Sequence, residues 1–190
     1  PPALLWKAAL TDNGHACASC AGGMLFITDH LGTNDIVRAL ALSDGQERWR
    51  YAYPDTHKYY QGFARATPTV HQGLVYTVSR MGRVHCLDAA TGRVIWQKDY
   101  IRDLAGQAPN HGFSAPVGVW GNKAYLQPGG TNGNVVAVDK TTGALLWRGG
   151  NAEKPGYSLP VIVPFDNVPT LLCYSANTLM GLDPEDGKTL

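Results

Sequence analysis

The chain has 190 residues and a formal net charge of +1, and 44% of its residues are hydrophobic while 16% are charged. This balance is typical of a packed globular protein and excludes a disordered chain. The charge lacks the basic excess with which proteins attract nucleic acids, and no apolar run reaches the roughly 18 residues that a transmembrane helix needs. We therefore expect a folded protein with no nucleic-acid partner and no transmembrane segment.

The first element along the chain is a short apolar strand over residues 4–9, which contains Trp6. Beyond it, Cys17 and Cys20 form a C-x-x-C within small residues that indicate a strand entering a turn. A redox pair would instead start a helix beside a βαβ pattern, and a structural zinc would need a second ligand pair. We expect buried free thiols, with a disulfide or a metal site as alternatives.

A repeated segment organises the rest of the chain. Four apolar strands each lead to one glycine, and the glycines are 47, 51 and 44 residues apart. They are Gly45, Gly92, Gly143 and Gly187, and Trp49, Trp96 and Trp147 follow the first three by four residues. Four predicted strands per period of about 45 residues are typical of a β-propeller blade. The sequence predicts an all-β protein of four-stranded antiparallel blades, with about four blades at 14–53, 64–100, 112–150 and 156–190.

Each part of the repeat has a structural task. Asp88, Asp139 and Asp183 precede the glycine by four residues and are expected to accept hydrogen bonds from the turn that follows them. Glycine supplies the positive φ that such a turn requires. The first repeat has Ala41 at the aspartate position, so we expect its turn to be held less firmly. A buried tryptophan removes about 150–250 Å² from water, so the three repeat tryptophans are expected to join neighbouring blades.

Two further strands precede each repeat. Proline-containing stretches around Pro68, Pro116 and Pro160 are expected to form the innermost strands, with proline inside the strand at an edge or a bulge. Second strands are expected over residues 24–27, 74–78, 123–126 and 170–174. His85 lies in a predicted third strand, where a structural role is favoured.

The run from Leu87 to Trp96 resembles the tryptophan-docking repeat of quinoprotein alcohol dehydrogenases and of BamB-like propellers, and the resemblance covers nearly the whole chain. That family consists mostly of eight-bladed rings, so the resemblance implies the N-terminal half of such a ring, with residues 4–9 as the outer strand of another blade. It also implies an exported protein, periplasmic or extracellular. A half ring has open ends, which predicts a missing half or self-association.

The resemblance implies two functions. Quinone enzymes of the family hold pyrroloquinoline quinone (PQQ) with a carboxylate-bound calcium, an arginine and an aspartate, often beside a pair of adjacent cysteines. The chain has no adjacent cysteine pair and no Gly-Ala-Glu-like stretch in its loops between second and third strands. We therefore expect a non-catalytic scaffold that binds a protein partner or a small ligand, without cofactor or metal. The alternative is part of a PQQ- and calcium-dependent alcohol or sugar dehydrogenase.

The repeat places four residues at equivalent positions just before the innermost strands: His15, Arg65, Phe113 and Tyr157. In a propeller these residues surround the mouth of the central channel, where they would suit a small anionic or sugar-like ligand. The alternative is that they pack between blades. The tyrosine-rich segment 51–63, expected as a loop on the same face, either binds peptide or carbohydrate or seals a blade interface. No catalytic residue is predicted.

Overall fold

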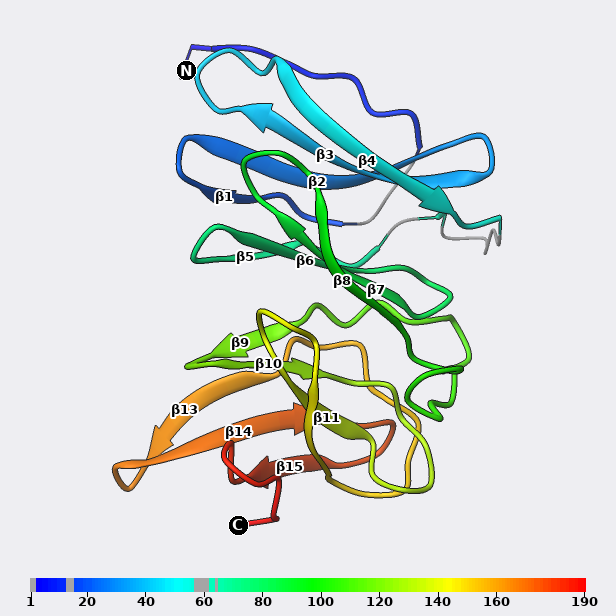
Figure 1. The fold of residues 1–190 in the computed structure, drawn as a ribbon, viewed down its shortest axis with the longest axis vertical. Coiled ribbons are helices and arrows are strands. Elements are labelled where there is room, and N and C mark those ends of the chain that lie inside the picture. Colours follow the sequence, from blue (N-terminus) through cyan, green and yellow to red (C-terminus); the bar gives the residue numbers. More distant parts are fainter. Residues whose placement is uncertain (1–2, 13–15, 57–61, 64) are drawn as a thin grey trace.

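The computed structural model describes residues 3–12, 16–56, 62–63 and 65–190. These residues form four antiparallel sheets and no helix (Figure 1). The expected all-β, partial propeller fold is confirmed. Within the described ranges no helix has the length and apolarity needed to cross a membrane.

In every sheet the strands pair in chain order, so that each sheet is an antiparallel meander. Blade 1 contains β1 (Ser19–Ala21), β2 (Met24–Leu31), β3 (Asn34–Ala41) and β4 (Glu47–Pro54). Blade 2 contains β5 (Thr69–His71), β6 (Leu74–Val78), β7 (Arg83–Asp88) and β8 (Val94–Asp99). Blade 3 contains β9 (Gly118–Trp120), β10 (Lys123–Leu126), β11 (Val135–Asp139) and β12 (Leu145–Gly149). Blade 4 has the strands β13 (Val161–Phe165), β14 (Val168–Tyr174) and β15 (Leu179–Leu182).

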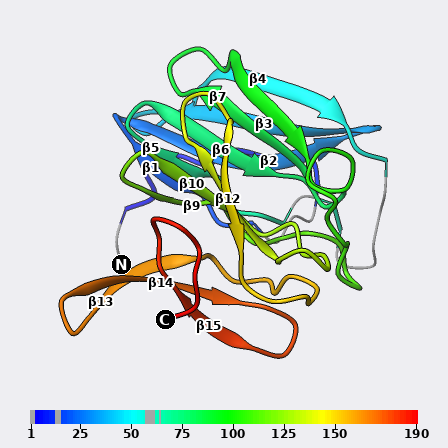
Figure 2. The ribbon, with the colours of Figure 1, turned by 60° about the horizontal axis from the view of Figure 1, so that its bottom comes forward.

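The blades follow one another in an open arc. The innermost strands β1, β5, β9 and β13 contact their neighbours in that order. Figure 1 places the two termini at opposite ends of the long axis, and Figure 2 shows blade 4, with the C-terminus, at one end of the stack. Strand β15 is an edge of the three-stranded blade 4, where it pairs with β14.

Repeat tryptophans join each blade to the next. The indole N–H of Trp49, Trp96 and Trp147 donates to the carbonyl oxygens of Ala89, Lys140 and Pro184 at 2.9, 3.0 and 3.1 Å. Each ring lies over the repeat glycine of the next blade, so that a Cβ on Gly143 would be 2.8 Å from Trp96. Trp6 contacts Gly45 in the same way and donates to the Leu42 carbonyl at 2.8 Å. Residues 4–9, expected as an outer strand, pair in none of the described sheets, but Trp6 docks this segment on blade 1 as each outer strand docks on the following blade.

Aspartates hold the repeat turns, as expected. The Asp88 carboxylate accepts hydrogen bonds from the backbone N–H groups of Ala90 and Thr91 at 3.1 and 2.8 Å. Equivalent bonds reach Asp139 from Thr141 and Thr142, and Asp183 from Glu185. In blade 1, where Ala41 replaces the aspartate, Asp44 accepts from the Gln46 N–H at 2.9 Å. The first turn therefore has one side-chain bond where the turn after Asp88 has several.

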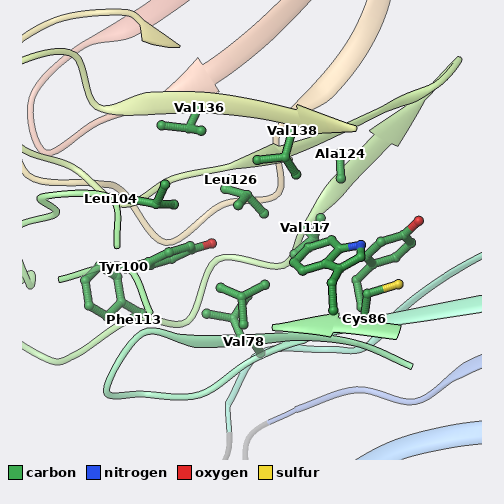
Figure 3. Close-up of a cluster of buried hydrophobic side chains, with 14 residues drawn as sticks. Val78, Cys86, Tyr100, Leu104, Phe113, Val117, Ala124, Leu126, Val136 and Val138 are labelled. Carbon is green, nitrogen blue, oxygen red and sulfur yellow. The ribbon is translucent and has the colours of Figure 1, made fainter. Parts of the chain in front are cut away.

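The largest hydrophobic cluster fills the space between blades 2 and 3. Figure 3 shows Tyr100 and Phe113 from the connecting loop packed together with Val78 of blade 2 and Leu126 and Val136 of blade 3. Trp96 is 7% exposed in this cluster. Burial at about 25 cal/mol per Å² makes this junction a large source of stability.

Three expectations were wrong in detail. The prolines precede the innermost strands instead of lying inside them, because β5 begins after Pro68 and β13 after Pro160. Of the segment 51–63, expected as a loop, residues 51–54 belong to strand β4 and pair with β3, while residues 57–61 lie outside the described residues. Cys17 and Cys20 are exposed free thiols, whereas Cys86 and Cys173 are buried free thiols. The exposed pair lies at or just before the short inner strand β1, which has β2 alone as its sheet partner.

Candidate functional site

Two of the predicted channel-mouth residues meet at one loop. Arg65 donates from Nη2 to the backbone carbonyl of His111. The N–H of His111 donates to the phenol oxygen of Tyr157 at 3.3 Å, and the two rings lie 6.3 Å apart. Arg65 and Tyr157 therefore approach the same residue from blades 2 and 4. His15, the fourth predicted member, lies outside the described residues.

Phe113 lies away from this meeting point. Its side chain is 3% exposed and packs edge-on against Tyr100, with ring centroids 5.0 Å apart. A Cβ on Gly82 would be 2.7 Å from the Phe113 ring, so that the close packing requires glycine there. Phe113 therefore contributes to the cluster between blades 2 and 3 (Figure 3).

A groove of about 580 Å³ opens beside Tyr157. Its walls come from residues 109–111, 154–158 and 174–177, and we call it the loop-face groove. This volume lies within the range of about 300–1,000 Å³ that is usual for small-ligand sites. Tyr157 and Tyr174 are 45% and 49% exposed, which leaves two aromatic faces open to a partner. Lys154 donates to Asn110 at 3.0 Å across the groove.

One carboxylate behind the loop-face groove holds two of its lining residues, Ser175 and Asn177, in place. Glu153 accepts hydrogen bonds from the Ser175 hydroxyl at 2.6 Å, the Asn177 N–H at 3.0 Å and the Thr178 hydroxyl at 2.8 Å. These bonds, the one from Ser175 foremost, lower the pKa of Glu153. The loop between β14 and β15 is therefore fixed to the segment that precedes β13, which gives the groove a preformed shape.

A buried polar cluster at the end of blade 1 was not anticipated from the sequence. His30 Nδ1 lies 2.8 Å from Asp35 Oδ1, and His30 Nε2 lies 2.8 Å from the Gly32 carbonyl. Both ring nitrogens of His30 therefore face oxygen atoms within hydrogen-bond distance. Burial, opposed by the His30 hydrogen bond, raises the pKa of Asp35 to about 6. His30 and Asp35 are cross-strand neighbours on β2 and β3, a pairing that becomes visible only when the Gly32 turn is located.

The donor set does not fit a calcium or other metal centre. Among the described residues no group of three or more His, Cys, Asp or Glu side chains is placed to hold a metal ion. The C-x-x-C thiols of Cys17 and Cys20 are exposed and not joined to each other.

The chain is similar to two kinds of protein. A family model described as outer membrane protein assembly factor BamB matches residues 3–158. A quinohemoprotein alcohol dehydrogenase, ADH IIB of Pseudomonas putida, is 35% identical over 88 residues, which are 43% of this chain and 12% of the relative. BamB of Shewanella oneidensis is 29% identical over 122 residues, which are 61% of this chain and 31% of the relative.

Solved structures show the same fold. The crystal structure of BamB from Moraxella catarrhalis superposes with a TM-score of 0.71 at 18% sequence identity and covers 99% of this chain. The chain spans about half of that structure (54%) and a smaller part of its curated relatives, 12% for ADH IIB. At this level of identity the similarity of structure establishes the fold.

Proposed function

Because the chain belongs to the family of the outer membrane protein assembly factor BamB, we propose that it is a non-catalytic propeller segment that binds a protein partner. The observation that carries this proposal is the loop-face groove, in which two exposed tyrosines lie beside lining residues that Glu153 holds in place. The groove is lined by loops next to the strands of blades 3 and 4. Binding surfaces are commonly built from loops that a scaffold of strands positions in this way.

The chemistry of the groove favours a peptide segment with an acidic or polar side chain. Tyrosine gives a large contact area at a low cost in conformational entropy. The basic side chains that line the groove are those of Lys154 and His111, and no carboxylate is among the lining residues. Asn110 and Asn177 add amide groups that bond to extended backbone.

Peptide selection tests this function. Twelve-residue peptides are selected against the protein, and the binding of the selected peptides is followed by fluorescence anisotropy. Tyr157→Ala and Tyr174→Ala are expected to weaken binding about tenfold or more, which is typical of an aromatic anchor at an interface. Trp120→Ala is the matched control, because Trp120 is also an exposed aromatic, at 37%, and lies outside the groove.

Selected peptides whose affinity is unchanged by either tyrosine substitution would overturn the assignment to the groove. Binding lost equally in the Trp120 variant would show an unspecific aromatic effect and would also count against it. Circular dichroism of each variant separates loss of binding from loss of fold.

A second function, part of a PQQ-dependent alcohol or sugar dehydrogenase, is supported by the 35% identity to ADH IIB. Dye reduction by the full-length protein with added PQQ, calcium and alcohol distinguishes the two functions. Alcohol-dependent turnover would replace the scaffold by the enzyme. The binding proposal expects no turnover above that of the quinone and calcium without protein.

We further propose that blades 1 to 4 form half of an eight-bladed ring in the periplasm or outside the cell. The open ends of the arc and the 54% coverage of the Moraxella structure support a second half, supplied by further blades or by self-association. Cell fractionation tests the location, and recovery of the protein with cytoplasmic markers would contradict it.

A further inference from the structure

A second cavity lies between blades 1 and 2, away from the loop-face groove. It has a volume of about 250 Å³. Tyr51 and Tyr53 of β4 form one wall, while Arg83 and His85 of β7 and Lys98 of β8 line the other side. The His85 ring lies 4.3 Å from the Tyr53 ring and 5.2 Å from the Tyr51 ring, measured between centroids. The cavity therefore joins an aromatic wall to a polar one.

His85 has an unsatisfied nitrogen in this wall. The side chain is 3% exposed, and its Nδ1 is buried without a hydrogen-bond partner in the described parts of the chain. Burial, followed by the charge of Arg83, lowers the pKa of His85 to about 4, so the ring is neutral at pH 7. A buried polar atom without a partner is destabilising, so a structural role alone does not explain the choice of histidine.

Two cationic side chains of the cavity form no ion pair with a residue that the structure describes. Arg83 is half-buried, and its Nη1 has no hydrogen-bond acceptor within the described ranges. Asp99 is its cross-strand neighbour, but no ion pair joins these two residues. The Asp99 carboxylate instead accepts from the N–H groups of Ile101 and Arg102, both at 2.9 Å. Lys98, on the same strand, forms no ion pair with any described residue, although after the hydrogen bond from Arg102 its charge contributes to lowering the pKa of Asp103.

The repeat supplies an internal comparison for these residues. Counted from the turn glycine, the position of His85 is occupied by Arg38 in blade 1, by Val136 in blade 3 and by Met180 in blade 4. Val136 and Met180 are buried in the apolar clusters that join blades 2 and 3 and blades 3 and 4. An apolar side chain therefore satisfies the fold at this position twice. Blade 1 carries a polar residue here as well, but Arg38 is paired with Asp29 and Glu47, whereas His85 keeps an orphan nitrogen where the cavity opens.

We propose that this inter-blade cavity binds a small aromatic carboxylate. The guanidinium of Arg83 and the ammonium of Lys98 give two positive charges, and Asp99 offsets one of them. The fourth charged lining residue, Arg102, is paired with Asp103 at 2.7 Å. One positive charge remains in the cavity. A ligand with a single negative charge neutralises it, whereas a phosphate dianion would leave an excess negative charge. The Tyr51 and Tyr53 rings provide the face for a flat apolar group, and the His85 ring lies in the same wall, with its unpaired Nδ1 just beneath the cavity surface.

Calorimetric titration of the intact protein with benzoate at pH 7.5 tests this site. Benzamide, which has the same shape without the charge, is the matched ligand. Benzoate is expected to bind at least tenfold more tightly than benzamide. Arg83→Gln is expected to weaken benzoate binding about tenfold, and His85→Val, which restores the residue type of blade 3, is expected to weaken it several-fold. Arg48→Gln, an exposed arginine on β4 outside the cavity, is expected to leave it unchanged.

Each arm of the titration has a result that overturns the proposal. Equal binding of benzamide and benzoate, or no binding of either, would exclude a carboxylate site. Tighter binding of inorganic phosphate would indicate a dianion site, and tighter binding of a capped glutamate peptide would indicate a protein-borne carboxylate. An unchanged benzoate affinity in Arg83→Gln would place binding elsewhere. The Arg83 variant keeps the test decisive if the His85 variant fails to fold.

Discussion

The junction between blades 2 and 3 and the junction between blades 1 and 2 use the same repeat for different purposes. At the first, Trp96, Phe113 and Val136 form a sealed apolar cluster (Figure 3). At the second, the equivalent of Val136 is His85, beside Arg83 and a cavity of about 250 Å³. In both, a tryptophan N–H donates to a carbonyl of the next blade, so the frame is unchanged. The contrast shows that the tryptophan and glycine hold the blades together, which leaves the other facing positions free to vary.

Removing a tryptophan from the sealed junction should have the largest effect. Trp96→Ala is expected to destabilise the protein by about 3–5 kcal/mol, because it leaves a large cavity and removes one hydrogen bond to the Lys140 carbonyl. Trp120→Ala, at an exposed strand end, is expected to cost less than about 1 kcal/mol. Urea unfolding of both variants measures the difference. Equal losses of stability would mean that the repeat tryptophan is not the residue that joins the blades.

Acid should lower the stability of the junction between blades 1 and 2, where His85 is buried. The pKa of His85 is lowered from 6.5 to about 4 in the fold, mainly by burial, so the unfolded chain binds more protons between these values. The stability due to the neutral ring is therefore complete above pH 6.5 and is lost as the pH falls towards 4. At about 1.4 kcal/mol per pKa unit the loss is roughly 3 kcal/mol.

His85→Val should remove this part of the acid sensitivity. The variant places in blade 2 the residue that blade 3 carries at the same repeat position, and its stability at pH 7.5 is expected to be equal to or higher than that of the parent protein. Unfolding free energies measured from pH 7.5 to 4 compare the two proteins. Parallel pH profiles would show that His85 does not titrate as its burial implies.

A pair of glycines separates tryptophan packing from backbone strain, with a smaller effect. Gly143 and Gly73 have φ values of +72° and +78°, so alanine is strained at both. A Cβ at Gly143 would also be 2.8 Å from Trp96, whereas a Cβ at Gly73 meets nothing within 4 Å. Gly143→Ala is expected to lower the unfolding free energy by about 1–2 kcal/mol more than Gly73→Ala. Thermal unfolding in which the two variants lose the same stability would argue against close contact between ring and turn.

Periodicity was sufficient for much of the fold. The strands expected over residues 74–78 and 123–126 have those bounds in the structure, and Asp88 and Asp139 hold their turns as predicted. The candidate site was less predictable. The repeat placed Arg65, Phe113 and Tyr157 at equivalent positions, yet Phe113 faces the core while Tyr157 is 45% exposed. Equivalence in a repeat specifies where a backbone lies, and the side chain then follows the space that its neighbours leave.

By itself, the sequence determined the blade: the strand order, the turn held by an aspartate and a glycine, and the tryptophan that docks on the next turn. These features depend on residues close in the chain or at a constant period, so a linear pattern records them. The tertiary structure alone decided which blade faces are sealed and which contain cavities. Tyr53 and His85 are 32 positions apart, and their rings meet at 4.3 Å because two blades pack against each other. Such contacts depend on volume and on the satisfaction of polar atoms, which no period in the sequence encodes.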